Sequence, residues 1–189
     1  EETGVTIILM DEKIDRGLIV RNKKLNIKDK KWAWKELEKE LAHLGAQLLI
    51  ETIPQWIKGE IKPVLQDESK AIFTKILKKE DGRIDWGKSA KDIERQIRAF
   101  EKFPGSFCFF PQNKKYLRVK FLKADVLAQT SHGPTGVLGK TFLASNNKIA
   151  IQTGKDFLIV EELQLEGKKQ TTSEDFLRGH PDFIGTVLE

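Results

Sequence analysis

The pattern of hydrophobic and polar positions changes its period once along this chain. Apolar residues recur at helical spacing upstream of Pro104-Gly105, and downstream they alternate with polar residues as in half-buried strands. At the change of period, residues 89–100 predict a helix capped by Ser89. Its faces differ in character, one being apolar (Ile93, Ile97 and Phe100) and the other basic (Lys91, Arg95, Arg98 and Lys102). The helix therefore separates a core side from a cationic side.

The upstream part predicts strands followed by a long helix. The run Val5-Thr6-Ile7-Ile8-Leu9-Met10 is continuously β-prone, which is typical of a strand covered on both faces in a parallel or mixed sheet. Residues 11–17 predict a polar loop at its carboxyl end, where open α/β sheets bind ligands, and a second strand begins at Leu18. Helical spacing then extends over residues 29–59 with an interruption at Gly45.

After Gly105 the pattern predicts short strands separated by turns. One predicted strand alternates polar with apolar side chains: Lys114, Tyr116, Arg118 and Lys120 against Leu117, Val119 and Phe121. Further strands are expected around residues 137–138, 149–151 and 157–160, and strands at this spacing predict a small barrel. Residues 173–179 predict a short capped helix that ends at a glycine.

Composition limits the class of protein. With 189 residues, of which 39% are hydrophobic, the chain can bury one ample core or two small ones. No stretch approaches the roughly 20 apolar residues that cross a bilayer, so we expect no membrane partner. The single cysteine, Cys108, excludes an intrachain disulfide and a cysteine-based metal site and fits a reducing cytoplasm. Its apolar neighbours indicate a buried structural thiol, and no metal is expected.

Charge is concentrated in one part of the chain. The net charge is only +5, yet between Trp86 and Lys140 eleven lysines and arginines face four acidic residues. Such an excess is typical of a surface that binds a polyanion, although a solvated lysine-rich surface has the same composition. The candidate binding residues are Arg95 and Arg98 on the predicted helix, Lys114, Arg118 and Lys120 on the predicted strand, and Lys75, Lys78 and Lys79 in the polar segment before them.

Several motifs, taken in this order and spacing, resemble the methionyl-tRNA formyltransferase family. They extend from the first residues nearly to the last. The motifs are Glu2-Thr3-Gly4-Val5-Thr6-Ile7, Asp11-Glu12-x-x-Asp15-x-Gly17, Gln66-Asp67-Glu68, Ile84-Asp85-Trp86, Ile93-Glu94-Arg95-Gln96-Ile97-Arg98-Ala99-Phe100 and Thr172-Ser173-x-Asp175-Phe176-Leu177. Each string alone is weak, whereas their combination is specific.

The resemblance implies a fold and a reaction. It implies an α/β remnant of a Rossmann-like formyltransferase domain in residues 1–67, a linker in residues 68–83, and an OB-like β-barrel with a capped helix in residues 84–189. The implied reaction transfers a formyl group from 10-formyltetrahydrofolate to the amino group of initiator methionyl-tRNA. The implied complete enzyme is cytoplasmic, monomeric and independent of metal.

The resemblance assigns one catalytic residue to this sequence. Asp15 matches the family's catalytic aspartate, which is thought to hold and polarise a histidine while the amine attacks the formyl carbon. The family's catalytic asparagine and histidine and most of its folate site match nothing here, so we expect this polypeptide alone to be inactive. Lys13 and Arg16 depart from the Gly and Thr common at these positions of the loop.

Two other interpretations remain open from the sequence. One is a stand-alone RNA-binding module, against which stands the buried type of strand at residues 5–10. The other stays within the formyltransferase family, because a folate-linked hydrolase and amino-sugar formyltransferases share parts of the Asp15 loop and of Ile84-Asp85-Trp86. The concentration of basic residues favours a tRNA substrate over a sugar or water.

Overall fold

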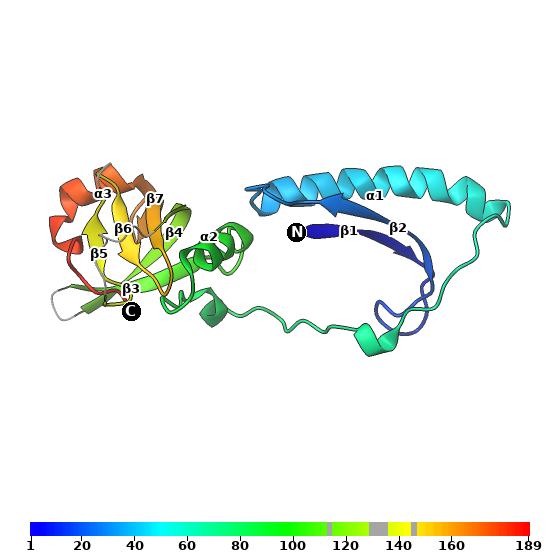
Figure 1. Cartoon of the computed structure of the whole chain (residues 1–189), viewed down its shortest axis with the longest axis horizontal. Coiled ribbons are helices and arrows are strands. Elements are labelled where there is room, and N and C mark those ends of the chain that lie inside the picture. Colours follow the sequence, from blue (N-terminus) through cyan, green and yellow to red (C-terminus); the bar gives the residue numbers. More distant parts are fainter. Residues whose placement is uncertain (113–114, 129–135, 145–146) are drawn as a thin grey trace. The chain divides into compact units, whose positions relative to one another are not determined.

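The computed structural model describes residues 1–112, 115–128, 136–144 and 147–189. Within them the chain forms two compact units, Glu1–Lys75 (unit 1) and Ile76–Glu189 (unit 2), each of which is drawn in Figure 1. Among the described residues, no helix has the length and apolar character that crossing a bilayer demands.

Unit 1 consists of a two-stranded sheet and one long helix. Strand β1 (Glu2–Ile8) pairs antiparallel with β2 (Ile19–Asn26), helix α1 (Trp34–Ile57) packs on the sheet, and a 3₁₀ turn, η1 (Glu68–Lys70), follows. Burial alternates along β1, since only one of its faces is covered. The prediction of a parallel or mixed sheet covered on both faces is therefore wrong for the residues that form β1.

Helix α1 runs through Gly45 without a break, so the predicted interruption is also wrong. A Cβ placed on Gly45 would lie 3.4 Å from Cγ1 of Val5 on β1, which shows that the helix approaches the strand at this residue. Packing on the sheet outweighs the cost of about 1 kcal/mol that glycine brings to a helix interior.

Unit 2 is a six-stranded antiparallel sheet with helices. Its strands are β3 (Ser106–Gln112), β4 (Lys115–Leu127), β5 (Thr141–Leu143), β6 (Ile149–Gln152), β7 (Phe157–Leu165) and β8 (Thr171–Thr172). Its helices are α2 (Ala90–Ala99) and α3 (Ser173–Gly179), with 3₁₀ turns η2 (Lys79–Gly82) and η3 (Pro181–Phe183). The order is β3-β4-β7-β6-β5, and β8 pairs with β7.

Most of the elements predicted for unit 2 are confirmed, including the helices at residues 90–99 and 173–179 and the strands at 149–152 and 157–165. The strand predicted at residues 137–138 is wrong, since these residues lie outside the strands and β5 begins at Thr141. The predicted turn clusters fall largely on residues 129–135 and 145–146, which lie outside the described residues.

The strand order of unit 2 is open, because its end strands β3 and β5 do not pair with each other in the described residues. The C-terminal residues hydrogen-bond to both ends. Glu189 exchanges two backbone bonds with Phe109 of β3, at 2.7 and 3.0 Å, and Thr141 of β5 donates to Thr186 at 2.9 Å. The last residues of the chain thus cover the backbone of both end strands.

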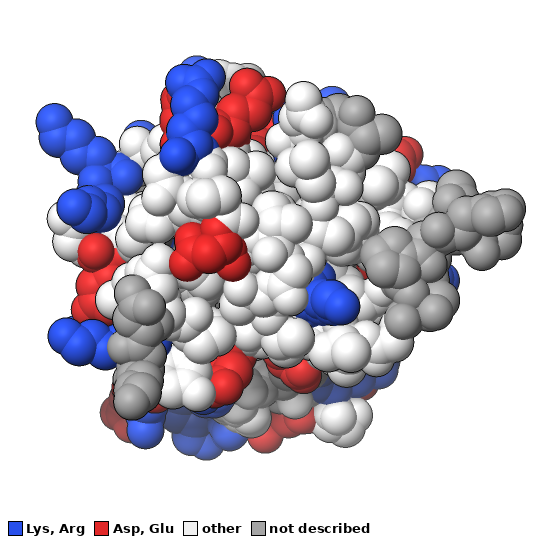
Figure 2. All heavy atoms as spheres, turned by 90° about the vertical axis from the view of Figure 1, so that its left-hand side faces the viewer, with Lys and Arg blue, Asp and Glu red and all other residues white. Residues whose placement is uncertain are grey.

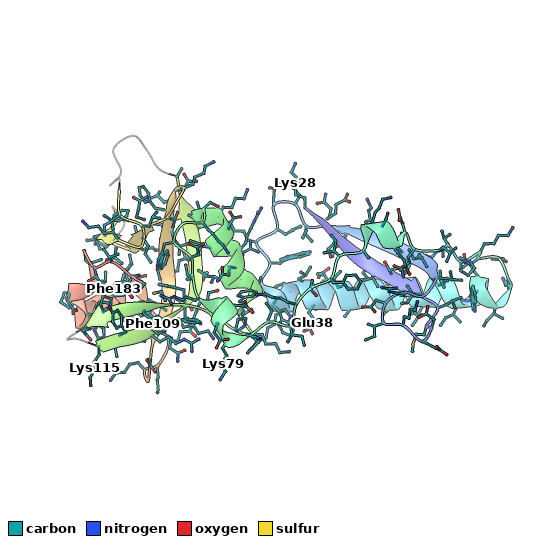
Figure 3. All side chains as sticks on the ribbon, turned by 90° about the horizontal axis from the view of Figure 1, so that it is seen from below. Lys28, Glu38, Lys79, Phe109, Lys115 and Phe183 are labelled. Carbon is teal, nitrogen blue, oxygen red and sulfur yellow. The ribbon has the colours of Figure 1, made fainter. Side chains whose placement is uncertain are left out.

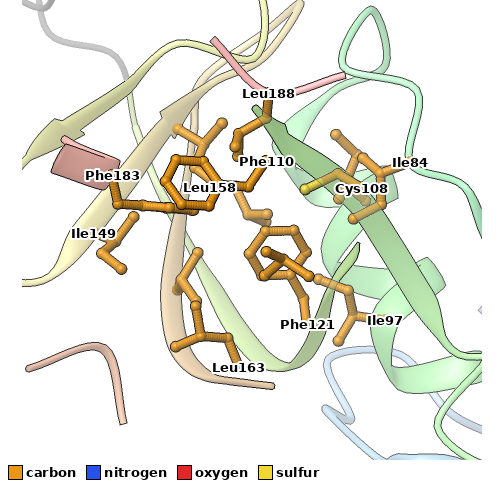
Figure 4. Packing of buried hydrophobic residues seen from close by; sticks show 14 of the residues in the cluster. Ile84, Ile97, Cys108, Phe110, Phe121, Ile149, Leu158, Leu163, Phe183 and Leu188 are labelled. Atoms are coloured by element: carbon orange, nitrogen blue, oxygen red, sulfur yellow. The ribbon is translucent and has the colours of Figure 1, made fainter. Parts of the chain in front are cut away.

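The core of unit 2 lies between the sheet and α2 (Figure 4). Ile93 and Ile97 of α2 are buried with Phe121 of β4, as the apolar face of the predicted helix requires. Phe110 packs edge-to-face on Phe183 with ring centroids 4.9 Å apart. Cys108 is a free buried thiol, and burial raises its pKa well above the usual range, which confirms the structural assignment.

Helix α2 begins at the predicted cap. Ser89 Oγ accepts the backbone N–H of Asp92 at 3.1 Å and donates to the Asp92 carboxylate at 2.6 Å. We expect Ser89→Ala to lower the free energy of unfolding by about 1 kcal/mol, whereas Ser89→Thr, which keeps the hydroxyl, should cost less. Urea denaturation of both variants checks this, and equal stabilities would contradict the role of the cap.

Candidate nucleic-acid interface

The outer face of the β3–β4 ribbon carries aromatic and basic side chains together. The antiparallel register places Phe107 opposite Lys120 and Phe109 opposite Arg118, so each ring has a cation as its cross-strand neighbour. The alternate residues Cys108 and Phe110 point into the core. We use the name β3–β4 surface for the four residues on the outer face together with Arg83: Arg83, Phe107, Phe109, Arg118 and Lys120.

Two guanidinium groups lie over the rings of this surface. Arg118 Cζ is 3.7 Å from the centroid of Phe107, and Arg83 Cζ is 5.4 Å from the centroid of Phe109. The two rings meet edge-to-face at 5.7 Å, which places both cations on one continuous aromatic support. Each arrangement lies within the range of a cation–π interaction, which favours a fixed position for the charge.

Lys120 completes the surface. Its side chain passes over Gly105, since a Cβ there would lie only 2.4 Å from Lys120 Cε and 2.9 Å from its Nζ. In the part of the chain that the structure describes, no acidic side chain forms an ion pair with Arg83, Arg118 or Lys120. Positive charges held in place without a carboxylate partner are suited to bind phosphate groups.

The sequence did not identify Arg83 as a candidate. Arg83 reaches the β3–β4 surface because the backbone at residues 83–84 runs beside β3, where Ile84 N donates to Phe107 O at 2.8 Å. The available signal was its position directly before Ile84-Asp85-Trp86, which does not by itself indicate proximity to Phe109.

Helix α2 positions its two candidate arginines differently. Arg98 binds the buried Glu94 in a bidentate manner, with Nε–Oε1 at 2.5 Å and Nη2–Oε2 at 3.0 Å. Arg95 is exposed, and its guanidinium lies 4.0 Å from the Asp92 carboxylate. The charge of Arg98 is thus committed to a carboxylate of its own helix, whereas the charge of Arg95 faces solvent.

The remaining candidates are Lys75, Lys78, Lys79 and Lys114. Lys75 belongs to unit 1, and Lys78 and Lys79 belong to unit 2; all three are exposed. Figure 3 labels Lys79 and Lys115 at the lower margin of unit 2 and Phe109 further in, on β3. Lys114 lies outside the described residues.

Another face of the molecule shows a different charge pattern. Figure 2 shows a largely uncharged central area with lysines and arginines mainly at its margin. On the face drawn in Figure 2, lysines and arginines are interspersed with acidic residues.

The predicted catalytic residue Asp15 lies in unit 1, on the loop that joins β1 to β2. It is exposed and adopts a positive φ of 59°. Its backbone carbonyl accepts a hydrogen bond from Gln66 Nε2 at 2.9 Å, and the same amide donates to Gly17 O at 2.7 Å. Within the described residues, no group of three or more His, Cys, Asp or Glu side chains is arranged to hold a metal ion.

Curated relatives of this chain include methionyl-tRNA formyltransferases from several bacteria. It is 35% identical over its whole length to the methionyl-tRNA formyltransferase of Lachnospira eligens, of which it covers 59%. It is 36% identical to the proteins of the same name from Bacillus velezensis and Chloroflexus aurantiacus. These matches include 100% and 96% of this chain, respectively, and 57% of each relative. The chain thus spans less than two thirds of these curated relatives.

Solved structures support the fold. HypX from Aquifex aeolicus in complex with tetrahydrofolic acid matches with a TM-score of 0.62 at 17% identity, over 96% of this chain and 30% of that one. An N-formyltransferase from Helicobacter canadensis in complex with folinic acid and dTDP-3-aminofucose matches with a TM-score of 0.61 at 20% identity, over 90% and 56%.

The family assignment rests on the sequence of unit 2. The model of the formyl transferase C-terminal domain matches residues 76–181, which is more than half of the chain and nearly all of that unit. The chain therefore belongs to the formyl transferase family.

Proposed function

We propose that this chain is part of a methionyl-tRNA formyltransferase, which transfers the formyl group of 10-formyltetrahydrofolate to the amino group of initiator methionyl-tRNA. The observation that carries the proposal is the β3–β4 surface, where the side chains of Arg83, Arg118 and Lys120 form no ion pair with an acidic side chain among the described residues. A tRNA substrate needs such a surface, because double-stranded RNA is bound mainly through its backbone and shape. A nucleotide-sugar substrate does not.

The proposed domain organisation follows the sequence motifs. Residues 1–67 belong to a Rossmann-like catalytic domain, residues 68–83 to a linker, and residues 84–189 to an OB-like domain that binds tRNA. Support for the OB-like domain comes from the C-terminal residues, whose bonds to Phe109 and Thr141 connect the two end strands of the sheet. The proposed complete enzyme is cytoplasmic and monomeric.

The proposed tRNA-binding residues differ in their surroundings, and we assign them different roles accordingly. Arg83, Arg118 and Lys120 are proposed to contact tRNA on the β3–β4 surface. Arg95 and the exposed Lys78 and Lys79 are proposed to contribute from outside that surface. Lys75 and Lys114 remain in the proposal on sequence grounds alone. Arg98 is proposed to act mainly through its ion pair with Glu94.

In the proposed reaction, the carboxylate of Asp15 acts on the imidazole of the catalytic histidine. A carboxylate beside an imidazole orients it and stabilises the imidazolium that forms when the attacking amine loses its proton. Asp15 lies on an exposed loop of the described residues. The catalytic histidine and most of the site for the formyl donor have no counterpart in this sequence. No step of the reaction requires a metal ion.

The function is tested with 10-formyltetrahydrofolate and two acceptors, together with a reaction that contains no acceptor. We expect the longest reading frame that encodes this chain to formylate methionyl-tRNA, and the 189-residue polypeptide alone to show no turnover. Formylation of a dTDP-amino sugar in preference to methionyl-tRNA would replace the proposal by an amino-sugar formyltransferase. Hydrolysis of the formyl donor without an acceptor would indicate a hydrolase instead.

Asp15→Asn in that complete protein should lower kcat by roughly 10- to 100-fold, because the amide keeps the shape of the carboxylate but loses its charge. Asparagine also tolerates a positive φ, so the loop should keep its conformation. Steady-state kinetics with circular dichroism as the folding control check this. A variant with the kcat of the wild type would make Asp15 a structural loop residue.

A further inference from the structure

A segment of unit 1, residues 64–68, runs along the loop that carries Asp15; it is extended as far as Asp67 and enters η1 at Glu68. Val64 and Ile19 exchange two backbone hydrogen bonds, at 2.8 and 2.9 Å. Further along the segment, the Gln66 side chain donates to loop carbonyls, and Glu68 lies 3.3 Å from the guanidinium of Arg16. Val64 thus contacts the start of β2, and Gln66, two residues further along the extended part, points to the same side and contacts the loop.

Gln66 makes the contacts closest to the carboxylate. Its Nε2 donates to the carbonyls of both Asp15 and Gly17, at 2.9 and 2.7 Å. A primary amide has two N–H bonds, so one side chain can fix two carbonyls that lie two residues apart. Both carbonyls would lose this donor if Gln66 were apolar, and a carboxylate in its place could not donate at all.

The backbone of the loop depends on such support. The φ of 59° at Asp15 lies in the left-handed region, which L residues other than glycine adopt at a cost. Gly17 admits no side chain, because a Cβ there would lie 1.7 Å from the carbonyl oxygen of Leu9. The Arg16–Glu68 ion pair is largely exposed, with 39% and 67% of the two side chains accessible, so it holds the loop only weakly.

We propose that Gln66 is a positioning residue for Asp15, which it holds in place through the carbonyls of Asp15 and Gly17. This inference rests on the proposed function, in which the Asp15 carboxylate acts on the catalytic histidine. A shift of about 1 Å in a reacting group can cost roughly 100-fold in rate. Loss of Gln66 should therefore slow formyl transfer and leave the tRNA-binding surface of unit 2 unchanged.

The first test measures loop order in the 189-residue chain itself, by ¹⁵N relaxation of the backbone amides of Arg16 and Gly17. Gln66→Leu should lower their order parameters, and Gln66→Lys, whose ammonium group can donate to both carbonyls, should restore them in part. The matched control is Gln47→Leu, which removes an exposed amide that contacts His43 at 3.0 Å elsewhere in unit 1. Equal loop order in Gln66→Leu and Gln47→Leu would overturn the inference.

The second test is kinetic and uses the complete formyltransferase. Gln66→Leu should lower kcat by roughly 10- to 100-fold and keep the KM for methionyl-tRNA within about twofold of the wild-type value. Gln66→Lys should have a kcat between that of Gln66→Leu and that of the wild type. A raised KM with unchanged kcat would overturn the positioning role. If the wild-type protein formylates no methionyl-tRNA, the proposed function fails, and the relaxation comparison alone decides whether Gln66 fixes the loop.

Discussion

Replacing Arg83, Arg118 and Lys120 together by alanine should weaken the binding of methionyl-tRNA by about two orders of magnitude at 0.1 M salt. Each phosphate contact that is lost flattens the slope of log K against log[salt] by about 0.7 to 0.9, so three contacts correspond to about 100- to 500-fold between 1 M and 0.1 M salt. The three single variants should each show about one third of the change in slope, since each phosphate contact contributes about equally to it.

The matched control is Lys123→Ala on the same strand, β4. Lys123 Nζ lies 3.1 Å from the Glu161 carboxylate, and this hydrogen bond raises the pKa of Lys123. Hydrogen bonds from Lys148 and from Lys123 lower the pKa of Glu161. Because the charge of Lys123 already has a partner, the salt dependence of binding should stay close to that of the wild type. If the triple variant kept the wild-type slope with its fold intact, the binding face would lie elsewhere and the β3–β4 surface would be an ordinary solvated surface.

Arg98→Ala should lower the free energy of unfolding by roughly 2 to 4 kcal/mol, the largest effect that we expect from one basic residue of this chain. The Glu94 carboxylate is only 8% accessible and is held by Arg98 through two hydrogen bonds. Without the guanidinium, Glu94 keeps a buried charge that no partner compensates, which costs free energy. Urea denaturation followed by circular dichroism measures the loss.

Arg95→Ala is the control for this prediction, on the same helix and three residues away. Arg95 is half exposed and 4.0 Å from Asp92, so its removal should change stability by no more than about 0.5 kcal/mol. The double variant Arg98→Ala/Glu94→Gln should recover part of the stability that Arg98→Ala loses, because no buried charge is left. Equal stabilities of Arg98→Ala and Arg95→Ala would contradict the structural role of Arg98.

The two units differ in how completely they bury their apolar residues. Unit 2 has a large core in which Phe110, Phe121 and Phe183 are almost fully buried. In unit 1, all of whose residues the structure describes, Leu48 is the only hydrophobic residue that is fully buried. Ile50 and Ile57 of α1 remain largely exposed. We therefore expect the cooperative unfolding of this chain to report mainly on unit 2.

Local patterns were sufficient for the elements that have a strong period or a cap. The i, i+4 spacing of Ile93 and Ile97, with Ser89 before them, determined helix α2 and its buried face, and the alternation around Val119 determined which side of β4 meets the core. The motifs, read in order, determined the family, because their combined spacing is specific where single strings are not. Each of these inferences uses residues that are close together in the sequence.

Contacts between distant residues were decided only by the tertiary structure. The run at residues 5–10 predicted a strand covered on both faces in a parallel or mixed sheet, whereas β1 pairs antiparallel with β2, a partner that the local pattern does not specify. Helical spacing placed Arg95 and Arg98 on one face, yet burial of Glu94 commits one of them to an ion pair. Arg83 meets Phe109, and Gln66 meets Asp15, across 26 and 51 positions of sequence. Such contacts depend on how the elements pack, which the period of a local pattern does not contain.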